Sequence, residues 1–441
     1  MRVVRVSIDA PSGAREDITV RGGASEARAR LIAQGEKWVL QVRPVDIVAL
    51  GLHEGQQVAL WPDAEGWRIG PYIGIMTVLR PSARGGFCSL SGKRDNYDGL
   101  ARIGREYGAV VFVFAAENMY YRQKRVLGYG RNAARQWVAR EYPWPDVIYN
   151  RVPDRTSEGK RTVTLAKRRF TEQGGALFNP GFLNKWQLHA WLSQDDALAR
   201  YLPGTRLLRS ATDLLRMLKE HQMVYLKPVS SFAGQGIFQL RTTGNGFLLR
   251  YREGTQMREE HCVDFRGLLQ TVSLRKQPGT YIVQQGLSLA MYQGAIFDVR
   301  VLVQKGAAGT WDLTGIGVRV AGRGGITTHV PCGGYIAPVE KILRDVFGEK
   351  PDTKDGIYQR VKKLALAIAP TIEKHMRQEL GEMSMDIGIT KKGECYFFEA
   401  NAKPMKFDEP HIRRLSLCRL VEYSSFLAGK RVTNGASHAG N

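Results

Sequence analysis

Two carboxylates and one amide stand in apolar, strand-like sequence in the last quarter of the chain. Asp386 lies in "MSMDIGIT", and Glu399 and Asn401 lie in "YFFEANAKP". Side chains alternate between the two faces of a strand, so Asp386 shares a face with Ser384. The same alternation predicts that Phe397, Glu399 and Asn401 share a face of the second segment. Polar groups are poorly suited to such strands unless something binds them, which makes these residues candidates for ion binding.

The loop "KKGE" between the two segments predicts a β-hairpin. A turn centred on Lys392 and Gly393 places Asp386 directly opposite Glu399. Opposed carboxylates repel each other unless a cation lies between them. With Asn401 as a third oxygen donor, the set suits Mg²⁺ better than Zn²⁺. The alternative, a solvent-facing polar side of a half-buried hairpin, explains the same residues equally well.

A lysine followed by a loop of small residues forms a second candidate site. In "VYLKPVSSFAGQGIFQL" an apolar strand ends at Lys227, just before Pro228. The small residues of the loop are Ser230, Ser231, Gly234 and Gly236. Backbone N–H groups of such a loop, together with the lysine charge, can approach phosphates closely. No GxxxxGK[ST] motif occurs, and by itself an ordinary glycine hairpin with a surface lysine explains the segment better.

The segment "FDVRVLVQK" places an acid and an arginine on the same face of a strand. Asp298 and Arg300 alternate there with apolar residues. An acid could accept hydrogen bonds from ribose hydroxyls and an arginine could bind phosphate. An intrastrand ion pair on a wet face is the alternative.

Another glycine pattern points to a different cofactor. "VLGYGRNAA" has Gly128, Gly130 and Ala133 in GxGxxA spacing. A dinucleotide fingerprint needs a strand before it, a helix after it and an acid about 20 residues further on. The preceding strand is short and basic, and Asp146 stands in a proline-rich turn. Nicotinamide binding is therefore disfavoured.

The composition favours anionic partners. The chain has 441 residues and a formal net charge of +22, with a pI of about 9.9. Nucleotides, acidic peptides, nucleic acid and anionic polymers all suit such a charge. The basic run "KRTVTLAKRRF" (160–170) is interpreted as a solvated connector, because no zinc-finger spacing or RNP-type aromatic motif accompanies it. Nucleic acid is accordingly not an expected partner.

The expected compartment is the cytoplasm, without a membrane. The longest apolar run, "AVVFVFAA", is far shorter than the about 20 residues that a membrane-spanning helix needs. The first residues lack the apolar core of a secretory signal. No two cysteines have CxxC spacing, so neither a disulfide framework nor a zinc site is expected. The cysteines are Cys88, Cys262, Cys332, Cys395 and Cys418.

The patterns predict a multidomain protein with α/β and α+β parts. Short strands and turns predict a β-rich domain over 1–70. Alternating strands and helices then predict a small α/β domain of parallel type over 71–175. The largest domain is expected over 176–430, and it begins with one helix that starts at Asn184. A flexible tail is expected over 431–441.

Taken in order, these motifs resemble those of the ATP-grasp superfamily. The lysine with its small-residue loop, the acid–arginine strand, and an aspartate followed 13 residues later by "EAN" are typical of its ATP and magnesium sites. The resemblance covers roughly 180–430. "GPYIGIMT", "PWPDVIYNRV" and "YLKPVSSFAGQGI" make the whole chain similar to the YheC/YheD family of endospore coat-associated ATP-grasp proteins.

The resemblance implies a role for each matching residue. Asp386, Glu399 and Asn401 would hold Mg²⁺, with Mn²⁺ as an alternative. The catalytic residues would be Arg300, Arg319 and Lys403, close to the reacting phosphate. The implied nucleotide-binding residues are Lys185, Lys227, Ser230, Ser231, Gly234, Gly236, Gln284 and Asp298, of which Gln284 takes the place of a hinge acid that meets adenine and Asp298 would hold the ribose.

One position departs from the superfamily pattern. Many of its peptide ligases have an arginine two residues before the metal-binding aspartate, where this chain has Ser384. Arg319, Arg323 or Lys403 could replace that arginine, so the resemblance implies ATP binding more directly than it implies the chemical step.

The resemblance implies an ATP- and Mg²⁺-dependent ligase that joins a carboxylate to an amine through an acyl-phosphate. The substrate would be a small-molecule or peptide carboxylate, and spore-coat proteins are further expected partners. The main alternative is a spore-coat structural or binding protein that retains the nucleotide site, and a nucleic-acid binder is a distant one. The sequence does not identify the acid, the amine or the oligomeric state.

Overall fold

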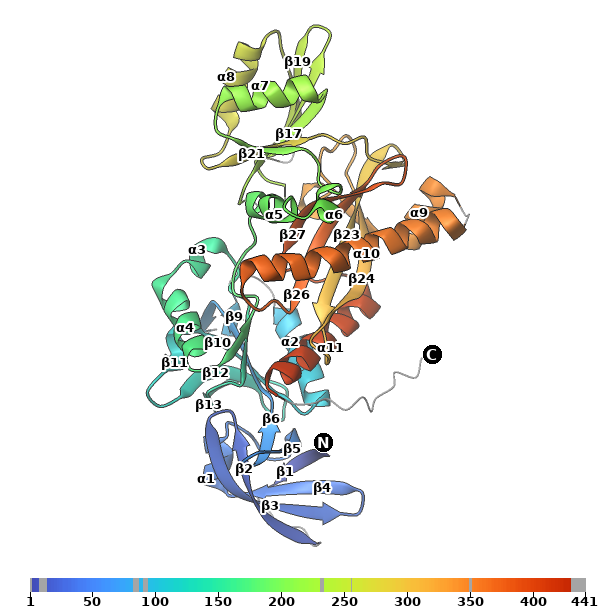
Figure 1. The fold of residues 1–441 in the computed structure, drawn as a ribbon. Helices are drawn as coiled ribbons and strands as arrows, with labels where there is room; N and C mark the ends of the chain where they lie inside the picture. The colour runs from blue at the N-terminus through green and yellow to red at the C-terminus, as the bar shows by residue number, and fades with distance from the viewer. Residues whose placement is uncertain are drawn as a thin grey trace.

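The structure, a computed structural model, describes residues 2–7, 14–81, 87–89, 94–230, 234–254, 256–348 and 351–429. Its strands form a closed barrel, a seven-stranded sheet, two six-stranded sheets and a short two-stranded sheet. Figure 1 shows these units following one another through the molecule, from the blue N-terminal barrel to the yellow-green segment at the opposite end. The tail predicted at 431–441 lies outside the described residues.

The N-terminal strands close on themselves and leave no free sheet edge. The barrel consists of β1 (Arg2–Ser7), β2 (Arg15–Gly22), β3 (Ser25–Gln34), β4 (Lys37–Val42), α1 (Pro44–Ala49), β5 (Gln57–Asp63) and β6 (Gly66–Gly70). Strand order is β1-β4-β3-β2-β6-β5. Alternation sends Val6, Val20 and Leu40 into the interior, where each is fully buried. Closure protects every backbone hydrogen-bonding group of the strands from unwanted pairing.

The next segment forms a seven-stranded sheet, called the second sheet here. Its elements, with those attached to it, are β7 (Tyr72–Thr77), β8 (Leu79–Pro81), β9 (Phe87–Ser89), α2 (Arg94–Glu106), β10 (Val110–Ala115), η1 (Ala116–Asn118), β11 (Met119–Tyr120), β12 (Arg125–Arg131), β13 (Trp137–Pro143), β14 (Val147–Asn150), α3 (Arg155–Glu158), α4 (Arg161–Glu172) and β15 (Ala176–Phe178). Strands β10, β7, β14 and β15 are parallel, whereas β11, β12 and β13 join as antiparallel neighbours. The expected α/β domain of parallel type is present in the four parallel strands, and the antiparallel strands are an addition that the sequence analysis did not predict.

Two sequence interpretations within the second sheet are corrected by the structure. The basic run 160–170 is helix α4, because Val163, Ala166 and Phe170 recur with helical spacing and are buried. Gly128 and Gly130 lie on β12, inside the sheet, and not on a loop that opens a helix. A Cβ at either glycine would strike an aromatic ring of a neighbouring strand. These glycines make room for rings, so the dinucleotide fingerprint is not formed.

The third unit is an antiparallel sheet that carries Lys227, called the lysine sheet here. Its elements and the helices before it are α5 (Lys185–Leu192), α6 (Asp196–Ala199), β16 (Thr205–Leu208), α7 (Ala211–Glu220), β17 (Met223–Pro228), β18 (Phe238–Thr243), β19 (Gly246–Glu253), β20 (Gln256–Cys262), α8 (Phe265–Arg275) and β21 (Tyr281–Gln285). Strand order is β16-β21-β17-β18-β19-β20. The single helix expected from Asn184 is two helices, because Asp195 caps a new start at α6.

Period-two alternation determines which face of the lysine sheet is free. Val224 and Leu226 pack in one buried cluster with residues of α7 and α8. The intervening residues, Tyr225 and Lys227, therefore point to the opposite face. That face lies toward the next sheet in Figure 1.

The fourth unit carries the paired acids and is called the carboxylate sheet here. Its elements are β22 (Met291–Tyr292), β23 (Ala295–Lys305), β24 (Trp311–Val320), η2 (Val330–Cys332), β25 (Tyr335–Ala337), α9 (Val339–Phe347), α10 (Pro351–Met376), β26 (Glu382–Ile389), β27 (Cys395–Asn401) and α11 (Pro410–Leu427). The strand order is β25-β24-β23-β26-β27, with β22 beside β23. Figure 1 shows α10 lying across this sheet, and Val301 and Met385 pack with Val361 of α10 in one core.

The other face of the carboxylate sheet is covered only in part. Leu302 of β23 packs there against Phe407 and Ile412, the latter at the start of α11. By alternation, Asp298 and Arg300 lie on the same face, beyond the cover of this cluster. The candidate site is therefore positioned on the half of this face that the lysine sheet approaches.

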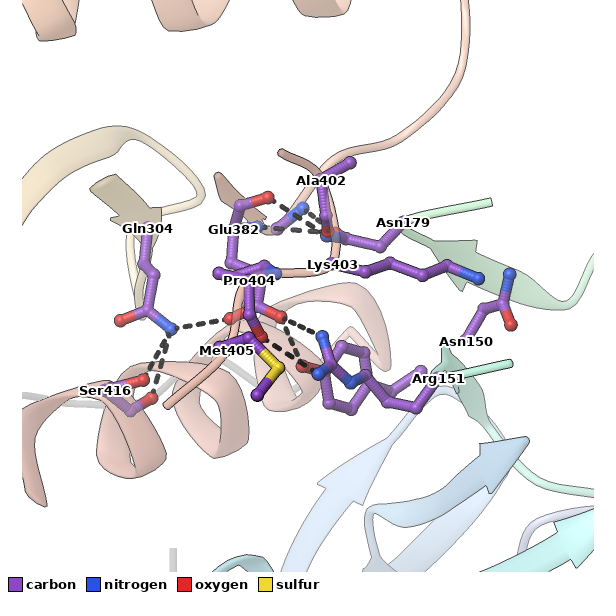
Figure 2. A network of polar contacts seen from close by, with 12 residues as sticks. Asn150, Arg151, Asn179, Gln304, Glu382, Ala402, Lys403, Pro404, Met405 and Ser416 are labelled. Carbon is purple, nitrogen blue, oxygen red and sulfur yellow. Dashed lines mark hydrogen bonds and ion pairs between the residues drawn. The ribbon is translucent and has the colours of Figure 1, made fainter. Parts of the chain in front are cut away.

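Buried polar contacts fix the second sheet to the carboxylate sheet (Figure 2). The Arg151 guanidinium donates to Glu382 Oε1 at 3.1 Å and to the Pro404 carbonyl oxygen at 3.0 Å. The Asn179 side chain donates to the Glu382 carbonyl oxygen at 3.0 Å and also to that of Ala402. Arg151 and Glu382 are 4% and 3% exposed. The network holds the segment that directly follows β27, and thereby the end of the strand that carries Glu399.

Within the described ranges, no helix is both long and apolar enough to cross a membrane. The described free thiols are Cys262, Cys332, Cys395 and Cys418.

Candidate functional site

The two acids face each other as the sequence predicted, although the hairpin is not regular. Asp386 pairs with Glu399 across β26 and β27. Nearer the turn, Ile387 pairs with Phe397, so one extra residue is inserted in β27 between these two pairs. This β-bulge at Phe398 restores the predicted pairing of the acids.

Because of the bulge, one side chain of β27 lies on the opposite face from the one predicted. Phe397 was expected to share a face with Glu399, but it packs in the core with Met385 and Ile387. The extra residue reverses the alternation at this point, because each inserted residue shifts the following side chains to the other face. Phe398 instead lies near the lysine sheet, with its ring 5.2 Å from Lys227 Nζ.

Cations of the protein neutralise the acid pair. Asp386 is only 4% exposed and Ser384 is fully buried, so this is not a solvent-facing polar side. Arg319 Nη2 lies 2.6 Å from Asp386 Oδ2. Lys185 Nζ, at the first position of α5, lies 2.9 Å from Glu399 Oε2. The repulsion expected for opposed carboxylates is therefore offset by one cation from each side of the site.

The two acids differ in proton affinity. Burial raises the pKa of Asp386 to about 6, against the attraction of Arg319. Burial would also raise the pKa of Glu399, but Lys185 and His329 together hold it well below its usual range. Glu399 is thus the more firmly ionised member of the pair.

A second acid orients Arg319. Its Nε donates to Asp298 Oδ1 at 3.0 Å and its Nη2 to Asp298 Oδ2 at 2.7 Å. Thr328 Oγ1 donates to Asp298 Oδ2 at 2.6 Å. Burial would lower the pKa of Arg319, but Asp298 and Asp386 raise it above its ordinary value. Asp298 lies in the site but holds Arg319, and its predicted bond to ribose stays a prediction.

Lys227 and Gln284 meet on the free face of the lysine sheet. Lys227 Nζ donates to Gln284 Oε1 at 2.6 Å, and Gln284 Nε2 donates to Thr205 Oγ1 at 3.0 Å. Burial lowers the pKa of Lys227 to about 8. The predicted contact between Gln284 and adenine stays a prediction, since its carbonyl oxygen binds Lys227 here.

The small-residue loop approaches the carboxylate sheet closely. Gly234 and Gly236 have φ of +72° and +69°, the left-handed region that glycine adopts without strain. A Cβ at Gly234 would lie 2.7 Å from His329 Cδ2, so glycine permits this approach. Ser230 is exposed at the start of the loop. Ser231 lies outside the described residues.

The three predicted catalytic residues are not all brought together. Arg300 lies opposite Asp386 in the ladder between β23 and β26, and its guanidinium stacks 5.0 Å from the Phe407 ring. Its Nε is buried, and none of the described groups forms a hydrogen bond with it. The Lys403 ammonium instead contacts Glu158, and burial lowers the pKa of Lys403 to about 8. Lys403 is thus directed toward α3 and away from the acid pair.

A cavity of about 90 Å³ lies between the lysine sheet and the carboxylate sheet. The predicted residues that line it are Lys185, Lys227, Gln284, Asp298, Asp386 and Glu399. The sequence reasoning did not find Tyr225, Thr327, Thr328, His329 and Phe398, which line it as well. The glycine-rich segment "GRGGITTHVPCGG" was the available signal for three of these, because it directly follows the strand that carries Arg319.

The donor atoms present fit a hard divalent cation. Over the described ranges, no three or more His, Cys, Asp or Glu side chains converge on a common metal position. The predicted set instead combines two facing carboxylates with an amide: Asn401 Nδ2 lies 3.3 Å from Glu399 Oε1. Carboxylate and amide oxygens are ligands that Mg²⁺ accepts, with water and phosphate completing its shell.

The comparison with protein families agrees with this geometry. The family described as YheC/D like ATP-grasp matches residues 174–427, which is more than half of the chain. The chain belongs to this family. The match covers the lysine sheet and the carboxylate sheet, so the fold is an ATP-grasp fold preceded by the barrel and the second sheet.

Two relatives of this YheC/D-like ATP-grasp chain come from Bacillus subtilis (strain 168). "Endospore coat-associated protein YheD" is 29% identical over 381 residues, covering 83% of this chain and 81% of that protein. "Endospore coat-associated protein YheC" is 21% identical over 330 residues, covering 72% and 88%. Among solved structures, VanG D-Ala:D-Ser ligase from Enterococcus faecalis superposes with a TM-score of 0.47 at 12% identity, covering 82% of this chain and all of that one.

Proposed function

We propose that this protein is an ATP- and Mg²⁺-dependent ligase that joins a carboxylate to an amine through an acyl-phosphate. The observation that carries the proposal is the largely buried pair Asp386–Glu399, which shares one cavity with Lys185 of α5 and with Lys227 of the facing lysine sheet. Two acids and two lysines in one enclosed space suit a polyphosphate with its cation. Membership in an ATP-grasp family supports ATP as that polyphosphate.

The residues of the candidate site have different roles in this reaction. Lys185 and Lys227 bind the phosphates of ATP, while Asp386, Glu399 and Asn401 hold Mg²⁺, or Mn²⁺ in its place. The bound ion supplies neutralisation of the charge on the γ-phosphate. Asp298 keeps Arg319 oriented toward the same position by its two hydrogen bonds. Preoriented charges of this kind lower the barrier because they need no reorganisation during the reaction.

Binding of ATP requires the site to open. The cavity of about 90 Å³ is far below the about 300–1,000 Å³ of usual small-molecule pockets. The lysine sheet, with Lys227, must therefore move away from the carboxylate sheet. Lys185 stays beside Glu399 in this movement, because Leu188 and Leu192 of α5 pack in the core of the carboxylate sheet. Phosphate must therefore displace the Lys185 ammonium from Glu399, which frees the carboxylate for the metal ion. The ion pair at 2.9 Å is thus the closed, nucleotide-free arrangement of the site.

The reaction needs no nucleophile from the protein. An oxygen of the substrate carboxylate attacks the γ-phosphorus, the bond to the bridging oxygen breaks, and ADP leaves. The amine then attacks the acyl carbon, phosphate leaves with its oxygen, and the nitrogen releases a proton. A C–N bond, ADP and phosphate are the products.

Arg300 is the best replacement for the arginine that is missing at Ser384. Arg319 is held by Asp298 and Asp386 and is already assigned to the γ-phosphate. Lys403 is bound to Glu158, and Arg323 is exposed beyond the end of β24. Arg300 lies directly opposite Asp386 on the neighbouring strand, and its buried Nε donates to none of the described groups. Its Nη2 donates to the Met405 carbonyl oxygen at 3.3 Å. We therefore assign to Arg300 the stabilisation of charge on the acyl group.

ADP release tests the proposal. Purified protein with MgATP should release ADP only when a suitable carboxylate and amine are present, among amino acids and acidic peptides. Lys227→Ala should abolish this release and weaken ATP binding, whereas Lys391→Ala, on the hairpin turn, is the control and should change neither. ATP binding without any carboxylate-dependent ADP release would instead support a binding protein that retains the nucleotide site.

The names of the two relatives favour one addition to the proposal. Both are called endospore coat-associated, so association with the spore coat is proposed for this chain as well. Labelling the protein and fractionating spores tests this directly, and its absence from the coat fraction would exclude the association.

A further inference from the structure

A large cleft lies outside the candidate site, where the barrel, the second sheet and α11 meet. Its volume is about 1070 Å³, at the upper end of the range for ligand pockets, about 300–1,000 Å³. Residues of β1 and of the loop before β5 form one wall, and α2 with the β12–β13 hairpin forms the second. The third wall is the first two turns of α11. We call this the basic cleft, because eight arginines and no lysine line it, against four acids.

Direct contacts between the barrel and the second sheet hold the walls in place. Tyr72 Oη donates to the Leu50 carbonyl oxygen at 2.8 Å, and Arg140 Nη1 donates to the Leu52 carbonyl oxygen at 3.1 Å. The Ala59 N–H donates to the Gly108 carbonyl oxygen at 2.8 Å. The basic cleft is therefore formed by the fold itself, and a ligand would not need to order it.

Most of the positive charge in the basic cleft is available. Three of its arginines contact a carboxylate: Arg131 pairs with Asp98, and Arg102 and Arg414 both reach Glu106. Across the described ranges, the other five have no carboxylate within ion-pair distance. These five are Arg5, Arg105, Arg135, Arg140 and Arg413.

The chemistry of these side chains selects the ligand. A guanidinium presents two parallel N–H donors that match a carboxylate, and five such groups distributed over three walls suit several carboxylates on one chain. Single-stranded nucleic acid needs aromatic faces on which bases stack. Two residues of the lining carry an aromatic ring. Tyr142 is 2% exposed and stacked on Phe112 at 4.2 Å, and His53 is half-buried. Successive bases would not find a row of exposed aromatic faces there.

We propose that the basic cleft binds an acidic polypeptide segment, in which several Asp or Glu side chains meet the unpaired arginines. The four acids of the lining are compatible with this ligand, since they can accept hydrogen bonds from its backbone N–H groups. This binding is independent of the proposed ligase activity, because none of the residues of the candidate site lines the basic cleft.

Fluorescence anisotropy with a labelled decaglutamate peptide tests the proposal, with decaglutamine as the uncharged control. The parent protein should bind decaglutamate and not decaglutamine. The triple variant Arg5→Gln/Arg105→Gln/Arg135→Gln removes three exposed charges and should weaken binding about tenfold or more, since each exposed ion pair contributes modestly. Lys227→Ala should bind the peptide like the parent even if it loses ATP binding, which separates this proposal from the proposed function.

A matched variant controls for the overall charge of the protein. Arg161→Gln/Arg216→Gln/Arg266→Gln removes three exposed charges from α4, α7 and α8, outside the basic cleft. It should bind decaglutamate within about twofold of the parent, because salt screens the attraction between the peptide and charges far from the basic cleft. Equal losses in both triple variants, or no binding by the parent, would overturn the proposal. Displacement by oligodeoxythymidylate at a lower concentration than by unlabelled decaglutamate would overturn it in favour of nucleic acid.

Discussion

The candidate site and the basic cleft treat charge in opposite ways. In the candidate site, both facing acids already contact a cation: Asp386 contacts Arg319 and Glu399 contacts Lys185. In the basic cleft, five of the eight arginines contact no carboxylate of the described chain. Burial explains the difference, since an unpaired charge removed from water is costly, whereas an exposed one remains hydrated.

The comparison indicates what a ligand must do in each place. In the candidate site it must replace existing ion pairs, so binding requires movement and exchange of partners. In the basic cleft it adds carboxylates to arginines that contact no carboxylate of the described chain, so binding requires only charge and length. Sensitivity to single substitutions should therefore be large in the first region and small in the second.

The largest effect is expected for Arg319→Met. This change leaves Asp298 and Asp386 buried without their shared cation, and breaking such a buried pair costs about 3–5 kcal/mol. Urea unfolding should show a corresponding loss for the domain that contains the candidate site. Adding Asp386→Asn to Arg319→Met should recover part of the loss, because one uncompensated charge is removed. A loss as small as that of an exposed arginine would show that water solvates these acids.

A smaller loss is expected for Glu399→Gln in the absence of metal and nucleotide. Opposed carboxylates alone would predict unchanged or higher stability, but the substitution removes the negative charge that Lys185 contacts at 2.9 Å, which costs about 1–3 kcal/mol for a hydrogen-bonded charge. Mg²⁺-dependent ATP binding should be lost as well, since a carboxylate ligand is removed. Thermal unfolding without ligand and calorimetry with MgATP measure the two effects. Unchanged or raised stability would indicate that the repulsion between the acids dominates.

The pH dependence of ATP binding sharpens the comparison further. The pKa of Lys227 is lowered to about 8, and phosphate would raise it again in the complex. Above pH 8 the free protein must take up a proton to bind, so affinity should fall by up to about tenfold per pH unit. Below pH 8 the Lys227 ammonium is already charged, so titration of Lys227 should not change ATP affinity there. Lys227→Arg should remove the fall, because a guanidinium stays charged. A fall that persists in this variant would exclude Lys227 as its source.

The smallest effect is expected for Arg105→Gln in the basic cleft. Arg105 is exposed and its guanidinium has no carboxylate partner among the described residues, so stability should change by less than about 0.5 kcal/mol. ATP affinity should be unchanged. A loss of stability comparable to that of Glu399→Gln would mean that this arginine holds the fold together, and the contrast between the two regions would disappear.

Local patterns in the sequence were sufficient for several parts of the site. The apolar pattern placed Asp386 within one strand and Lys227 at the end of another, and the structure has both strands. The hairpin turn placed Asp386 against Glu399, and the structure confirms that pair. Period and turn position indicated these features because they depend on residues close together in the chain. The acid pair also depends on the bulge at Phe398, since the pairs nearer the turn lie one residue away from the predicted register.

Other parts depended on contacts that no local pattern contains. The second sheet was expected to be of parallel type, and the sequence did not indicate that β12 and β13 add to it as antiparallel strands. Lys403 follows the metal motif in the sequence, yet its ammonium is drawn to Glu158, 245 residues earlier in the chain. The position of the Lys403 ammonium is therefore decided by an acid far away in the sequence, and not by the metal motif next to it.

The amino-acid sequence by itself determined which residues form the acid pair, which lysine ends the facing strand, and to which family the chain is similar. Only the tertiary structure decided that Arg319 and Lys185 neutralise the acids, and that arginines from three separate units gather in one cleft. The physical reason is that hydrophobic period and turn chemistry act over a few residues. Ion pairing and burial act instead between segments that only the packed fold brings together.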